Sequence, residues 1–206
     1  MPDSVKDFSG KLSSLVFLYE KAKLAIVALG TYNQDNEEHI GPHNEMRNAL
    51  SHIIGMIKNQ DNIEVCNGEL RAAQAHLRRA GCDAYELLCS HLIEYIHSLL
   101  FKFDHDDIAI PFPFYYTEIR PKIIDIQDKI KEIRVDKEVE PNYRGDLFEH
   151  FSEQSELLIG YVKVVNNHIP VIMEIKRKRR KNKLRDYLIG GLIGFVISGL
   201  FFILSR

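Results

Sequence analysis

The chain has 206 residues, of which 45% are hydrophobic, and a net charge of −2, with no Trp and only three Cys. This length is enough for one domain with a sizeable core. Three cysteines without regular spacing exclude a disulfide framework and indicate reduced residues packed in helices, in a protein that faces the cytosol. Charges interrupt the apolar stretches of the first thirty residues, so no signal peptide is expected.

The first half of the chain predicts three helices. Apolar residues recur every three or four positions from Val5 to Leu29, which predicts a helix that ends near Gly30. After a stretch rich in turn residues, the same spacing predicts a second helix from about Asn44 to Asn59 and a third from Glu69 to Phe103. At 1.5 Å per residue the third helix is about 50 Å long, enough to serve as the spine of a bundle.

The second half predicts two more helices. Pro111 and Pro113 interrupt the helical pattern, so the chain is expected to turn there. Isoleucines at helical spacing predict a fourth helix from about Tyr116 to Arg134, and a fifth runs from about Gly145 towards Lys183, kinked by Pro170. Because the sequence has no β pattern of useful length, the expected fold is all-α, an antiparallel bundle of about five helices.

The charge is distributed unevenly along the chain. Residues 176–206 contain nine basic residues and one acid, a net charge of +8, whereas the residues before them contain eighteen basic and twenty-eight acidic residues, a net charge of −10. Eight of the cations fall within ten positions: Lys176, Arg177, Lys178, Arg179, Arg180, Lys181, Lys183 and Arg185. The two parts of the chain are therefore expected to face different surroundings.

An uncharged stretch, residues 187–204, follows this basic run. Its eighteen residues would span about 27 Å as a helix, close to the thickness of a hydrocarbon core, which predicts a transmembrane helix. Cations beside such a helix stay on the cytoplasmic side, so we expect a single-pass C-terminal membrane anchor with a cytoplasmic body and with the basic residues on membrane lipids. The alternatives are a buried helix and, for the basic run, a segment that binds nucleic acid.

These features divide the chain into a cytoplasmic bundle (residues 1–175), a juxtamembrane basic segment (176–186) and a transmembrane helix (187–204). Small residues recur every four positions in the last of these: Gly190, Gly194 and Ser198. Because such spacing lets two helices approach closely, a homodimer or a higher homo-oligomer is expected. The alternative is that glycine is simply common in membrane helices.

The stretch "RNALSH" places Arg47, Asn48 and His52 close together in the sequence. Asn48 and His52 are four residues apart on one helix face, so the amide is expected to hydrogen-bond the imidazole and fix its tautomer. Because the predicted helix begins near Asn44, Arg47 is expected in the first turn, where the helix dipole favours an anion. The three residues therefore predict a phosphate site.

This stretch resembles the motif of the HEPN family of helical-bundle ribonucleases, in which Arg and a polar residue precede His by a few positions. The resemblance covers the motif and the bundle that carries it, about residues 1–175. It implies a dimer with one composite site that cleaves RNA without a metal or another cofactor. It also implies that His52 is the general acid or base, that Arg47 stabilises the phosphorane charge and that Asn48 orients His52. Members of the family often serve as toxins or in antiviral defence.

Other residues offer weaker alternatives. The spacing from Arg to His recurs from Arg71 to His76 and from Arg144 to His150, without a polar residue after the arginine. The trio at 47–52 can also be read as the ordinary surface of an amphipathic helix.

Two further groups of charged residues are candidates for a functional site. Arg79 and Asp83 are spaced as an ion pair that could line the same cleft, and "DHDD" (residues 104–107) could hold a cation but lacks an established ligand spacing. Two functional hypotheses therefore stand: a membrane-anchored ribonuclease, and a non-enzymatic effector or scaffold that clusters through its tail helix.

Overall fold

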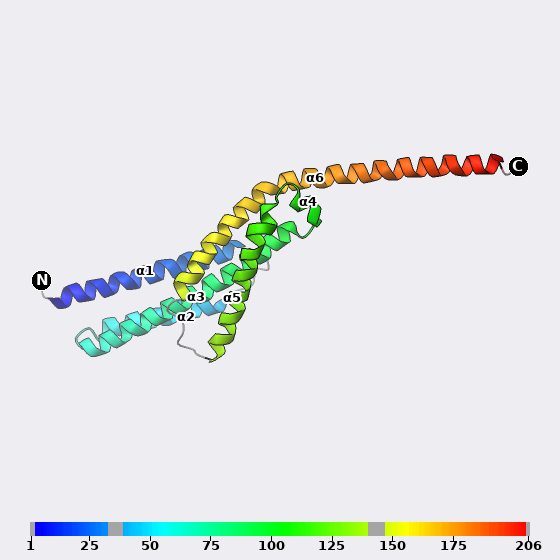
Figure 1. The fold of residues 1–206 in the computed structure, drawn as a ribbon. Helices are drawn as coiled ribbons and strands as arrows, with labels where there is room; N and C mark the ends of the chain where they lie inside the picture. The colour runs from blue at the N-terminus through cyan, green and yellow to red at the C-terminus, as the bar shows by residue number, and fades with distance from the viewer. Residues whose placement is uncertain (1–2, 33–38, 140–146, 205–206) are drawn as a thin grey trace.

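The computed structural model describes residues 3–32, 39–139 and 147–204, with side chains for residues 10, 12–32, 39–133 and 147–197. These residues are helical, with no strand among them, so the all-α prediction is confirmed (Figure 1). The elements are α1 (Asp3–Tyr32), α2 (Ile40–Lys58), α3 (Ile63–Leu100), α4 (His105–Ala109), the π-helical turn η1 (Tyr115–Ile119), α5 (Arg120–Val139) and α6 (Leu147–Leu204).

The starts of α2 and α3 differ most from the prediction. α2 begins four residues before Asn44, and Pro42 lies in its first turn, where a missing N–H leaves no hydrogen bond unmade. α3 begins six residues before Glu69, where the side chain of Asn62 accepts a hydrogen bond from the backbone N–H of Val65 at 3.2 Å. The cap at Asn62 therefore sets the start of α3, whereas α2 starts at Ile40 without a side-chain cap, ahead of the first regular apolar repeat.

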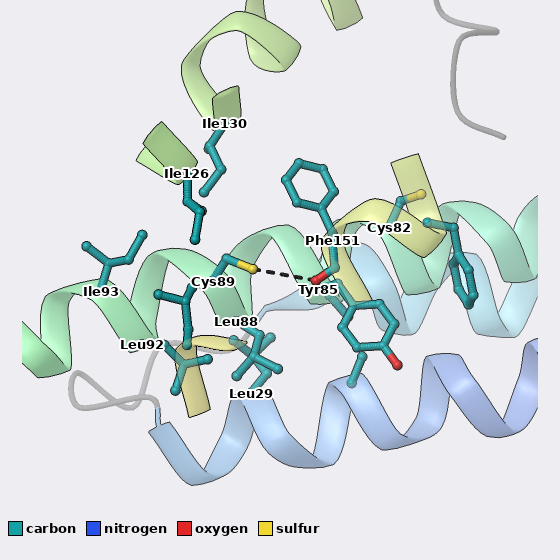
Figure 2. Close-up of a cluster of buried hydrophobic side chains, with 14 of the residues drawn as sticks. Leu29, Cys82, Tyr85, Leu88, Cys89, Leu92, Ile93, Ile126, Ile130 and Phe151 are labelled. Atoms are coloured by element: carbon teal, nitrogen blue, oxygen red, sulfur yellow. Dashed lines mark hydrogen bonds between the residues drawn. The ribbon is translucent and has the colours of Figure 1, made fainter. Parts of the chain in front are cut away.

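The long helix α3 is the spine of the fold, and α1, α2 and α6 all pack against it. In Figure 1, α1 and α3 run in the same direction, and α2 runs in the opposite direction. α6 crosses α3 obliquely. Figure 2 shows the core at the middle of α3, where Leu88 and Cys89 meet Leu29 of α1 and Phe151 of α6. Burial of these apolar side chains is the main term that stabilises the bundle.

Gly81 of α3 lies in close contact with Phe148 of α6. A Cβ atom at this position would lie 2.1 Å from the ring of Phe148, and both residues are buried. Gly81→Ala is therefore expected to force the two helices apart and to lower the free energy of unfolding by roughly 1–3 kcal/mol in urea denaturation. Gly160→Ala on α6 meets no atom within 4 Å and should raise that free energy by up to about 1 kcal/mol. Equal stability of the two variants would contradict the packing.

The proline-containing turn forms as predicted, and the acids of "DHDD" hold it to α6. Arg179 of α6 donates to Asp107 Oδ1 and to Asp106 Oδ2, each at 2.9 Å, and the backbone N–H of Asp104 donates to Asp107 Oδ2. Hydrogen bonding from His105, with the charge of Arg179, lowers the pKa of Asp106. These carboxylates are thus used for a helix cap and an ion pair.

The predicted transmembrane helix is wrong. Over the described residues, no helix has an apolar stretch long enough to cross a membrane. α6 runs unbroken from Leu147 to Leu204, past Pro170, and bends in Figure 1 between its yellow and orange parts. The charged residues 176–181, 183, 185 and 186 lie on this same helix directly before its uncharged end.

The localisation that depended on this helix is wrong for the same reason. The C-terminal anchor and the orientation of the body that depended on it both required a span that the described residues do not provide. Contacts of the basic run with membrane lipids stay a prediction. Gly190 and Gly194 are exposed on α6, whereas the side chain of Ser198 lies outside the described residues. Packing of a second helix on these three residues stays a prediction.

Candidate functional site: a histidine cluster between α2 and α3

Helices α2 and α3 carry the same spacing of two ionisable residues. Glu45 precedes His52 by seven residues on α2, and Glu69 precedes His76 by seven residues on α3. Seven residues are about two helical turns, so each pair lies on one face of its helix. Because the two helices run in opposite directions, each glutamate meets the histidine of the other helix.

The resulting contacts are short and reciprocal. The Nδ1 atom of His52 lies 2.7 Å from Glu69 Oε2, and the Nδ1 atom of His76 lies 2.7 Å from Glu45 Oε2. The two imidazole rings stack, with centroids 5.1 Å apart and planes at 19°. Since a carboxylate holds Nδ1 of each ring, Nε2 is the nitrogen available for proton transfer.

Arg79 completes this group, which we call the histidine cluster: Glu45, His52, Glu69, His76 and Arg79. The Nε atom of Arg79 donates to Glu45 Oε2 at 2.9 Å, and its Nη2 atom lies 2.6 Å from Nδ1 of His76. Nδ1 of His76 can thus donate to Glu45 when it carries a proton and accept from Arg79 when it does not. Nδ1 of His76 therefore has a hydrogen-bond partner in either tautomer of the neutral ring.

The electrostatics keep the carboxylate of Glu45 ionised. Burial alone would raise the pKa of Glu45, but hydrogen bonds from His76 and Arg79 outweigh it, and the pKa is lowered. The contribution of this carboxylate to stability is present above its ordinary pKa and is lost as the pH falls through the lowered value. Across the neutral range, Glu45 therefore remains a negative partner for His76.

The cluster is open on one side. The side chains of His52, His76 and Arg79 are 34%, 18% and 31% exposed, so a ligand can reach the rings without unfolding the helices. Gly55 makes the pairing of His52 possible, because a Cβ atom there would lie 2.9 Å from the carboxylate carbon of Glu69. The absence of a side chain at this position leaves room for Glu69 to reach across to α2.

Only one residue of the predicted trio enters the histidine cluster. His52 does, whereas Arg47 and Asn48 are exposed. Two residues after Glu45, Arg47 lies about 200° around the helix and so points away from α3. Since α2 starts at Ile40, Arg47 lies beyond the first turn, where the effect of the helix dipole has faded.

The predicted bond between Asn48 and His52 is not present among the described residues, and Nδ1 of His52 contacts Glu69 instead. The structure does bring in His76 and Arg79, which the sequence offered only in weaker combinations with Arg71 and Asp83. In the third stretch with the spacing from Arg to His, Arg144 lies outside the described residues and His150 lies on α6.

The signal that could have found the cluster is the repeated spacing from Glu to His on two consecutive helices. Within the described residues, no three His, Cys, Asp or Glu side chains are arranged to hold a metal ion. In the comparisons with family models, curated proteins and solved structures, nothing matches this chain.

Proposed function

We propose that the histidine cluster is the catalytic site of a metal-independent, HEPN-like endoribonuclease. The observation that carries this proposal is the pair of stacked imidazoles, His52 and His76, each bonded to a carboxylate through Nδ1 and lying beside Arg79. Two histidines with free Nε2 atoms can act as a general base and a general acid in one reaction. Arg79 supplies a positive charge next to them.

The reaction that suits this set is transfer of a phosphodiester within RNA. One imidazole takes the proton of the 2′-hydroxyl as its oxygen forms a bond to phosphorus, and the bond from phosphorus to the 5′-oxygen breaks. The other imidazole, protonated at the start, gives its proton to that leaving oxygen. The guanidinium of Arg79 stabilises the negative charge of the phosphorane. The products are a 2′,3′-cyclic phosphate and a free 5′-hydroxyl.

A homodimer is part of the proposal, and the apolar stripe on the outer face of α2 supports it. Leu50, Ile54 and Ile57 are 55%, 44% and 61% exposed and are spaced to lie on one face of the helix. This face is nearly opposite the histidine cluster, and Arg47 lies on it seven residues before Ile54. A twofold contact through the stripe uses the same surface of both copies and leaves one intact histidine cluster in each chain.

The same stripe favours the second candidate, a non-enzymatic scaffold that works by self-association. Cleavage by the purified full chain separates the two. The nuclease should cut a labelled single-stranded RNA in the presence of EDTA and leave 2′,3′-cyclic phosphate ends, and it should not cut the same sequence made of 2′-deoxynucleotides. A dimer that leaves RNA intact would overturn the nuclease and favour the scaffold.

A further inference from the structure

A second cluster of charge lies at the far end of α3, where α6 passes over it. Its residues line a groove of about 380 Å³, which we call the basic groove: Lys102, Phe103, Met173, Lys176, Arg177, Arg180 and Lys181. The five residues from α6 fall within about 140° of the helix circumference, so they form one face that is turned towards the end of α3.

Contacts on both sides fix this face in place. On one side, Arg179 is held by Asp106 and Asp107 of α4. On the other, the ammonium of Lys176 donates to the carbonyl oxygen of Lys102 and lies 5.2 Å from the ring centroid of Phe103. Because α6 is held in this way, the basic residues of the groove have fixed positions against the end of α3.

Most cations of the groove have no acidic partner. Lys178 and Arg179 belong to the same run but are paired with Glu174 and with the two aspartates. Over the described residues, Arg177, Arg180 and Lys181 form no ion pair. A chain whose first 175 residues have a net charge of −10 thus holds unneutralised positive charge around one open groove.

We propose that the basic groove binds the phosphodiester backbone of single-stranded RNA and anchors it for the histidine cluster, an inference that rests on the proposed function. The exposed Lys183, seven residues after Lys176, continues the same face of α6, so the charges form a line that suits an extended polyanion better than a single phosphate. The proposed nuclease also needs such a site, since its acidic body repels RNA elsewhere.

The distance between the two sites sets a length for the bound strand. Lys102 follows His76 by 26 residues, which corresponds to about 39 Å along α3 and the turn that follows it. A strand held in the basic groove must therefore extend over several nucleotides to reach the imidazoles. Very short oligonucleotides can reach one site at a time only.

Binding of a 2′-O-methyl RNA strand tests the groove separately from cleavage, because its blocked 2′-oxygen cannot attack the phosphate. The test variant of the full chain is Arg177→Gln/Arg180→Gln/Lys181→Gln, followed by fluorescence anisotropy at several salt concentrations. We expect its affinity to fall at least about tenfold at low salt. The slope of log affinity against log salt should flatten by about 2, as expected for loss of three contacts to a single strand.

The matched control removes three exposed lysines elsewhere: Lys23→Gln/Lys58→Gln/Lys163→Gln. It should keep most of the affinity and the salt slope of the wild type, although its net charge is the same as that of the groove variant. Equal losses in the two variants would overturn the groove as a site. Competition by polyglutamate as strong as by RNA would overturn the assignment to a phosphodiester and would point to an acidic protein surface.

Two further outcomes keep the two proposals apart. If binding depends on the groove but unmodified RNA is not cleaved, the groove stands as an RNA-binding site and the proposed nuclease function is wrong. If the groove variant cleaves RNA as fast as the control variant, the nuclease function stands and the groove is not the anchoring site. If the groove variant binds normally but changes the molecular mass in light scattering, the groove is a contact between copies of the chain and the proposal fails.

Discussion

His52→Ala and His76→Ala are each expected to lower the rate of RNA cleavage on the order of 10²- to 10⁴-fold, because each removes a proton-transferring group. The double variant should be little slower than either single variant, since the two imidazoles act in one reaction. Rates are measured with a labelled RNA at saturating protein, and thermal unfolding checks that the fold is intact. Full activity in His76→Ala would rule out the histidine cluster as the site.

Variants at neighbouring positions test the geometry behind this result. Arg79→Ala should impair cleavage strongly, whereas Arg47→Ala should be mild, because Arg47 lies on the opposite face of α2. Gly55→Ala brings a methyl group to about 2.9 Å from the carboxylate carbon of Glu69 and should displace that flexible side chain from His52. Its activity should fall between those of the wild type and His52→Ala, with little change in stability.

Phe151→Ala is expected to have the largest effect on stability, lowering the free energy of unfolding by about 3–5 kcal/mol. Its side chain is 1% exposed and lies where α6 meets the middle of α3, next to Cys89, whose Sγ lies 3.7 Å from the carbonyl oxygen of Phe151 (Figure 2). Removal of the ring leaves a cavity that two packed helices cannot close.

The control for this change is Phe101→Ala, at a ring that is 86% exposed, which should alter the free energy of unfolding by less than about 0.5 kcal/mol. Both values come from urea denaturation of the full chain. A similar small effect of the two substitutions would mean that α6 does not pack against α3 in solution.

Apolar spacing was enough to predict most of the helices. It located α1, α3 and α5 because each buries a regular stripe of side chains against its neighbours. It placed the start of α2 too late, since Gly41 and Pro42 read as turn residues although both are tolerated in a first turn. That error moved Arg47 into the first turn and made the trio at 47–52 resemble an anion site.

Apolar spacing did not find the histidine cluster, because the contacts between its glutamates and histidines join different helices. Glu45 and His76 are 31 residues apart, and no spacing within one helix reports their contact. The transmembrane prediction rested on the uncharged stretch 187–204 and on the cations beside it, but over the described residues no helix is long and apolar enough to cross a membrane. Pairings across helices and the extent of a helix both depend on tertiary packing.

The burial of every cysteine gives the chain a built-in chemical reporter of its own motions. Cys66, Cys82 and Cys89 are all buried, and burial, with a further contribution from the charge of Glu86, raises the pKa of Cys89 to about 12. At pH 8 only about one Cys89 thiol in 10⁴ is then a thiolate, so alkylating reagents attack it at a negligible rate in the closed structure. Its rate of alkylation therefore measures how often α6 lifts from α3, without any label added to the protein.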